Sequence, residues 1–186
     1  MRRNKLAQGF TFIELIMVIS IIGILAGSGA WLMANTVKNS VFIPNQMNMD
    51  KLANDALDIM IEGDNAAHGL RFAKVISAIA ANDLTFINQD SISIRYRILS
   101  NQLLRTIGAG TETVLPAYVA SLPSVTLAGK SSTLFTYYDS SEAVTATAAN
   151  VRRIKMILIA KTGTGLYNDW EGQSEQASSV SIDRLQ

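Results

Sequence analysis

The sequence predicts an α+β fold, in which a long N-terminal helix packs on an antiparallel β-sheet and one shorter helix lies between the two. Three observations predict it. Residues 10–34 form an apolar run of membrane-spanning length, residues 49–60 repeat apolar side chains with a helical period, and apolar and polar side chains alternate from Leu84 onward. With 186 residues, the chain has room for this helix and one domain of about 120 residues.

The N-terminus joins a basic leader to an apolar segment that contains one charge. Between residues 10 and 34 the only ionisable side chain is Glu14. About 20 residues at ~1.5 Å rise per residue cross the hydrocarbon core of a membrane. A charge near its middle costs roughly 2.5–3.5 kcal/mol, so Glu14 needs a partner. A cut before Phe10 would supply a free amine four residues away, and would leave the carboxylate near the positive end of the helix dipole.

Residues 35–62 are predicted to continue the helix as an amphipathic segment. Apolar side chains recur on one face at spacings of three and four: Met49, Leu52, Ala53, Ala56, Leu57 and Met60. The opposite face is polar, so we expect the apolar face to pack against a sheet. Glycines at 23, 27 and 29 and a proline at 44 weaken the helix, which makes these positions the expected flexible points.

Residues 63–186 are predicted to form one globular domain that opens with a second helix. A break at Gly63 leaves Asp64 or Asn65 as the N-cap. Five apolar side chains then share a helix face: Phe72, Ala73, Ile76, Ile79 and Ala80. We expect this helix to end near Asn82 and to pack on the sheet, the alternative being a helix that binds a partner.

The rest of the domain has the two-residue period of β-strands. Residues 92–98 alternate isoleucine and tyrosine with serine and arginine, which is typical of a half-buried strand. Further strands are expected at 84–87, 102–107, 133–138 and 151–161, with a short one at 180–182. Turn residues separate them, which favours an antiparallel meander.

The N-terminal residues resemble the leader and first helix of type IV pilins and type II secretion pseudopilins. The resemblance rests on MRRNKLAQG at 1–9 and FTFIELIMVISIIGILA at 10–26. It implies that a prepilin peptidase cuts after Gly9 and methylates the new N-terminal Phe10. It also implies that Glu14 is needed for methylation and subunit assembly, and that the helix of residues 10–34 passes from the membrane into the core of a filament.

Three features bear on the position of the chain within this family. It has no cysteine, whereas many major pilins close their C-terminal region with a disulfide, so the sequence favours a minor pseudopilin or minor pilin. Trp31 stands where the family commonly has a helix-breaking proline. The unwound helix segment found in the family therefore cannot be assumed for this chain. The presence of Glu14 separates the chain from the large tip pseudopilin, which lacks this residue.

The resemblance also implies the partners and the location. The expected partners are prepilin peptidase, other pilin or pseudopilin subunits, the lipid bilayer, and the inner-membrane assembly platform with its ATPase. The basic residues precede the apolar run, so the positive-inside rule predicts a cytoplasmic N-terminus and a C-terminal domain in the periplasm or outside. Removing residues 1–9 takes Lys plus Arg from 16 to 13 against 15 acidic groups, a formal charge of −2.

Other interpretations remain open. An ordinary secretory signal peptide would be cut near residues 26–30, and an uncleaved anchor would keep Met1. Glu14 argues against the first and is left unexplained by the second. A major adhesive or twitching pilin would share this N-terminus, and a membrane-tethered enzyme or binding protein would need a site in the domain.

We expect a structural protein rather than an enzyme, with no cofactor or catalytic residue. His68, the only histidine, does not make the usual zinc site alone, and the loop at 163–168 lacks the third glycine of a dinucleotide-binding turn. Asp139 and Glu142 are weak candidates for calcium, which takes about 6–8 oxygen ligands. Six basic residues could form a DNA-binding stripe, although the mature charge argues against nucleic acid: Arg95, Arg97, Arg105, Arg152, Arg153 and Lys155.

Overall fold

The computed structural model describes residues 11–100, 102–115, 125–129, 133–162 and 173–182. The chain divides into two compact units, residues 1–41 and 42–186, and each is described by itself.

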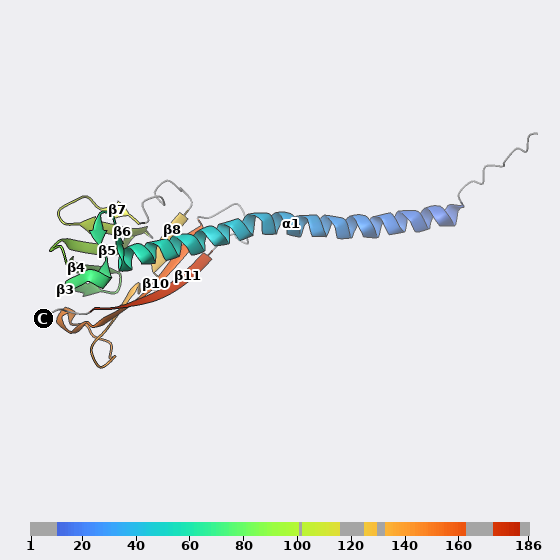
Figure 1. Cartoon of the computed structure of the whole chain (residues 1–186). Coiled ribbons are helices and arrows are strands. Elements are labelled where there is room, and N and C mark those ends of the chain that lie inside the picture. Colours follow the sequence, from blue (N-terminus) through green and yellow to red (C-terminus); the bar gives the residue numbers. More distant parts are fainter. Residues whose placement is uncertain (1–10, 101, 116–124, 130–132, 163–172, 183–186) are drawn as a thin grey trace, which may run out of the picture. The chain divides into compact units, whose positions relative to one another are not determined.

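One helix, α1 (Phe12–Ile61), runs through the first unit and into the second (Figure 1). From Phe12 to Ala34 every side chain is exposed in the isolated chain. This part is long and apolar enough to cross a membrane, by length and composition. The helix is uninterrupted at the three glycines and at Pro44, where we expected flexibility. The boundary between the units nevertheless falls just before Pro44, which has no N–H to donate to the carbonyl of Ser40.

The C-terminal part of α1 lies in the second unit and supplies one side of its core. All six apolar side chains of the predicted face are at most 4% exposed, which confirms the predicted amphipathic packing: Met49, Leu52, Ala53, Ala56, Leu57 and Met60. The helix ends because Gly63 follows with φ +95°, a left-handed conformation that favours glycine. A Cβ at this position would lie 2.2 Å from the carbonyl oxygen of Ala67, so the turn has no space for a side chain.

The predicted second helix is wrong. The chain instead forms a small hairpin, β1 (Gly63–Asp64) and β2 (Ala67–His68), a 3-10 turn η1 (Leu70–Phe72), and the strand β3 (Ala73–Ala80). The ladder of β3 with its neighbour shifts register twice, between Ala73 and Val75 and between Ile76 and Ala78. Such bulges insert residues into the alternation, so the inward positions of β3 fall three apart and imitate a helical spacing. In the part of the chain that the structure describes, α1 is the single α-helix.

β3 is the first strand of a five-stranded antiparallel sheet. The others follow in chain order: β4 (Asp83–Asn88), β5 (Ser93–Leu99), β6 (Gln102–Ile107) and β7 (Thr113–Val114). The strands predicted at 84–87, 92–98 and 102–107 are therefore confirmed. Their inward side chains join the core formed with the end of α1: Leu84, Phe86, Ile94, Tyr96 and Leu103.

The remaining strands form a second sheet, so the predicted single sheet is divided in two. They are β8 (Val125–Gly129), β9 (Phe135–Tyr138), β10 (Arg153–Thr162) and β11 (Gln173–Ser181). β10 pairs with β11 along one edge and with β8 and β9 along the other. A 3-10 turn, η4 (Ala148–Asn150), precedes β10. The two sheets meet where the hydroxyl of Tyr137 donates to the carbonyl of Ala80 at 2.8 Å.

Candidate functional site

The residue before α1, Thr11, and the third residue of the helix, Glu14, hold each other through reciprocal hydrogen bonds. The backbone N–H of Thr11 donates to Oε2 of Glu14 at 2.8 Å, and its hydroxyl donates to the same oxygen at 2.8 Å. The backbone N–H of Glu14 in turn donates to the Thr11 hydroxyl at 3.3 Å. This is a capping box, which satisfies N–H groups that a helix start leaves unpaired and keeps a carboxylate at the positive end of the helix dipole.

Sequence reasoning assigned Glu14 to this site but missed Thr11. The signal was present, since Thr-x-x-Glu directly before an apolar run is the pattern of a capping box. We expected the partner of Glu14 to be an amine created by cleavage, whereas the structure gives it a partner three residues away in the same chain. Both bonds from Thr11 end on Oε2, so Oε1 can accept from an ammonium group while the cap stays in place. Gly9 and Phe10 lie outside the described residues.

Behind the cap, the helix presents apolar side chains on all sides. Phe12 is 78% exposed and Trp31 is 67% exposed in the isolated chain. A helix that is apolar all round is stable when lipid or other protein surrounds it, and an exposed apolar surface of this extent marks a membrane or protein contact. The start of α1 therefore combines a hydrogen-bonded carboxylate, Glu14, with an apolar helix surface that is stable in contact with lipid or other protein.

The basic residues considered as a DNA-binding stripe are largely neutralised by carboxylates of the same chain. Nε of Arg95 donates to Asp83 at 2.9 Å, and Arg97 holds Glu112 through two bonds of 2.6 and 2.7 Å. The bond from Arg97 lowers the pKa of the Glu112 carboxyl below its ordinary value. Arg105 and Arg153 have acidic partners as well, Asp64 and Glu142 respectively. Paired arginines on strand faces give little attraction to nucleic acid.

The other candidate ligands are also engaged within the chain. Oδ1 of Asp139 accepts from the N–H and hydroxyl of Ser141 at 2.8 and 2.7 Å and from the N–H of Ala143 at 3.1 Å, which lowers the pKa of Asp139. His68 lies with Nδ1 2.5 Å from Oδ2 of Asp90. Among the described residues, no three His, Cys, Asp or Glu side chains cluster as metal ligands would. The glycine loop at 163–168 lies outside the described residues.

Comparison with known proteins points to the same end of the chain. Residues 4–30 match the family model of the prokaryotic N-terminal methylation motif. The matched residues include the Thr11–Glu14 cap and most of the apolar run. No curated protein and no solved structure matches the chain. The motif implies processing by a prepilin peptidase and assembly with pilins, and with the apolar helix it indicates inner-membrane anchoring before assembly. The chain is therefore type IV pilin-like or pseudopilin-like, since it carries a prepilin-type methylation motif on a long helix that packs against antiparallel sheets.

Proposed function

We propose that the chain is a minor structural subunit of a type IV filament-like assembly, either a type II secretion pseudopilus or a type IV pilus. The observation that carries the proposal is the exposed apolar part of α1, which directly follows a capped Glu14 inside a methylation motif. Residues 1–9 would be the leader, residues 10–34 the membrane and filament-core helix, residues 35–62 its amphipathic continuation, and residues 63–186 the globular domain.

The proposed sequence of events begins in the inner membrane. A prepilin peptidase cuts between Gly9 and Phe10 and methylates the new amine. During docking, the Glu14 carboxylate pairs with the Phe10 amine of a neighbouring subunit or of its own chain, because either charge buried alone is costly. Assembly then replaces lipid contacts of the apolar helix with helix–helix contacts, and the work is done by the platform and its ATPase.

The minor role is proposed because the chain has no cysteine with which to close its C-terminal region. A major pilin for adhesion, motility or DNA uptake is the alternative. Subunit stoichiometry separates them: quantitative mass spectrometry of sheared filaments should find this chain far below the most abundant subunit. A chain that makes up most of the filament would be a major pilin.

Processing provides the first test. Mass spectrometry of the protein from its native membrane should show a chain that starts at N-methylated Phe10. A start near Ala30 would restore the ordinary signal peptide, and an intact Met1 would indicate a simple anchor. Gly9→Val should block cleavage, because the peptidase must approach the backbone closely. The matched control is Gly23→Val, since a Cβ at Gly23 meets nothing within 4 Å, and this variant should be cut normally.

A further inference from the structure

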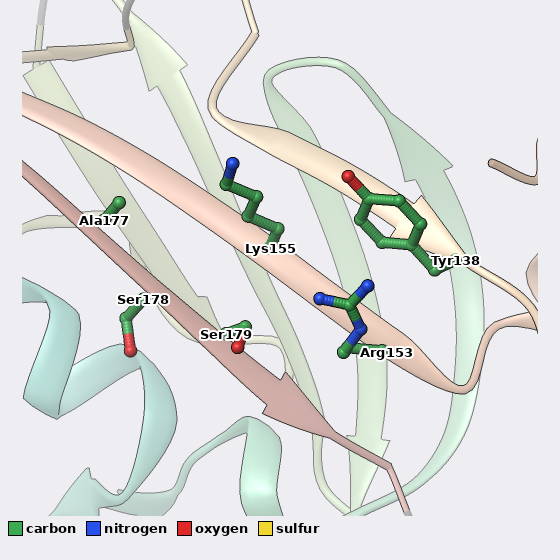
Figure 2. Close-up of a pocket in the computed structure, with 6 residues that line it drawn as sticks. All are labelled: Tyr138, Arg153, Lys155, Ala177, Ser178 and Ser179. Atoms are coloured by element: carbon green, nitrogen blue, oxygen red, sulfur yellow. The ribbon is translucent and has the colours of Figure 1, made fainter. Parts of the chain in front are cut away.

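The outer face of the second sheet carries a polar cleft of about 460 Å³ (Figure 2). Its lining comes from three neighbouring strands: Tyr138 of β9, Arg153 and Lys155 of β10, and Ala177, Ser178 and Ser179 of β11. β10 is paired on both sides, so its backbone is fixed. Arg153 and Lys155 are two residues apart and therefore stand on the same face, about 7 Å from each other.

Arg153 is held in place by contacts on two sides. Its guanidinium carbon lies 4.3 Å from the centre of the Tyr138 ring, and Nη2 donates to the carboxylate of Glu142. Nε of Arg153 is buried and has no hydrogen-bond partner in the structure. These contacts keep the guanidinium at the edge of the cleft beside the Tyr138 ring, whereas the buried Nε is not accessible to an incoming group.

Lys155 gives the cleft its net positive charge. Its direct cross-strand neighbours are Thr136 and Ser179, both uncharged. Within the described ranges no carboxylate pairs with Lys155, in contrast to the neutralised arginines Arg95, Arg97, Arg105 and Arg153. Figure 2 shows the Lys155 amine and the Arg153 guanidinium on the same side of β10, with the Tyr138 ring beside them. A half-buried ammonium flanked by hydroxyl groups favours an oxygen anion.

We propose that this cleft binds the carboxylate side chains of an acidic, extended peptide segment of a neighbouring protein. Charge complementarity selects an anion, and the hydroxyls of Ser179 and Tyr138 supply further donors along the strands. A single exposed ion pair contributes little binding free energy, so a small free anion would bind weakly. A peptide segment that lies across the strands makes further contacts and would bind more tightly. Nucleic acid needs several phosphate contacts, and the lining of the cleft offers one ammonium without a carboxylate partner. The identification of the neighbour as another filament subunit rests on the proposed function. The binding of an acidic peptide by the cleft does not depend on it.

The test uses the full chain in uncharged detergent micelles at low ionic strength. The probe is a dye-labelled, serine- and alanine-based pentapeptide with glutamate at alternate positions, compared with the same peptide carrying glutamine, and binding is followed by fluorescence anisotropy. The glutamate peptide should bind the more tightly, and Lys155→Gln should weaken it by about fivefold, the upper range for an exposed ion pair. Lys155→Arg should retain binding. Lys161→Gln is the matched control, because Lys161 is an exposed lysine on the same strand and face but outside the cleft.

Three outcomes would overturn the proposal. Lys155→Gln could bind the glutamate peptide as tightly as the unaltered chain, the glutamine peptide could bind equally well, or a single-stranded oligonucleotide could bind more tightly than the peptide and depend on Lys155. Circular dichroism of each variant checks that the sheet is intact. The start of the mature chain at Phe10 is measured separately, so loss of peptide binding with normal processing would reject the cleft and leave the proposed function standing.

Discussion

At the scale of single residues, the Thr11–Glu14 cap explains how a carboxylate can stand at the edge of an apolar helix. Two donors from Thr11 converge on Oε2 of Glu14 at 2.8 Å each. Hydrogen bonds to a charged group are roughly twice as strong as neutral ones, so the cap offsets part of the cost of removing the carboxylate from water. Glu14 therefore has two separable properties, its hydrogen bonds within the chain and its charge.

Two substitutions separate these properties. Glu14→Gln removes the charge but keeps an oxygen that can complete a capping box, so the protein should insert in the membrane and be cut after Gly9. Its incorporation into sheared filaments should fall by about tenfold or more, since an ammonium left without a counter-charge costs at least the ~1.4 kcal/mol that a tenfold change represents. Thr11→Val keeps the charge and loses the hydroxyl, which should lower the stability of the helix by about 1 kcal/mol. This variant should still be incorporated into filaments.

Immunoblotting of membrane and filament fractions measures both variants side by side. If Glu14→Gln entered filaments at the level of the unaltered chain, the electrostatic role in docking would be wrong. If Thr11→Val failed as completely as Glu14→Gln, the cap rather than the charge would be the requirement for assembly.

At the scale of elements, a buried arginine joins the end of α1 to the five-stranded sheet. Arg105 on β6 is 7% exposed and donates to Oδ2 of Asp64 at 2.8 Å, directly after the helix. Its cross-strand partner Tyr96 donates to the carbonyl of Ile59 in the last turn of α1, at 3.4 Å. Burial raises the pKa of Tyr96 to about 12, so this phenol keeps its proton at neutral pH. Together these bonds fix the end of the helix over the sheet.

The two partners of this ion pair should respond unequally to substitution. Asp64→Asn leaves a charged guanidinium buried without a counter-charge and should destabilise the protein by about 2–4 kcal/mol. Arg105→Met leaves a carboxylate that is 34% exposed and can be hydrated. This variant should therefore lose only about 1–2 kcal/mol of its free energy of unfolding. Urea unfolding of the detergent-solubilised chain measures both free energies of unfolding. Equal losses would show that the buried charge is not what makes the Asp64 substitution costly.

The pH dependence of stability should follow the same pair. Burial raises the pKa of Asp64, but the bonds from Arg105 and from the backbone of Ala66 and Ala67 outweigh it, so the pKa lies below its ordinary 3.8. A lowered pKa in the folded state gives stability that is present above pH ~4 and is lost as the pH falls through the folded value. The unaltered chain should therefore lose more stability between about pH 7 and pH 3 than Arg105→Met does.

The sequence predicted an element correctly where the spacing of its apolar residues matches the spacing of its buried side chains in the structure. The helix face from Met49 to Met60 and the strand from Ser93 to Leu99 follow undisturbed helical and two-residue periods. β3 was misassigned because its two register shifts bring Ala73 and Ile76 to the core three residues apart. β11 was predicted only at its end, since its serines and glutamines have low strand propensity and its nine residues depend on the ladder with β10. The cleft could not be predicted, because it joins side chains of three strands.

At the scale of the whole molecule, exposed apolar side chains are concentrated in one of the two units. Fifteen of the twenty exposed large apolar side chains of the described residues lie between Phe12 and Val37. The core cluster, in contrast, begins at Met49 and lies within residues 42–186. One continuous helix therefore serves two environments, lipid or neighbouring helices at its start and a protein core at its end.

This distribution predicts that a fragment of residues 39–186 is soluble, monomeric and cooperatively folded, because it keeps the whole core and loses most of the exposed apolar surface. Light scattering coupled to gel filtration gives its mass, and circular dichroism with urea gives the cooperativity of its unfolding. Leu57→Asp in this fragment should abolish cooperative unfolding, since Leu57 is 4% exposed and a carboxylate there has no partner. Lys51→Asp, on the exposed face of the same helix, should change stability by about 0.5 kcal/mol or less. An aggregated fragment would show that the membrane half of α1 is needed for the domain to fold, and equal damage by the two variants would show that the burial of Leu57 does not decide the cost of the substitution.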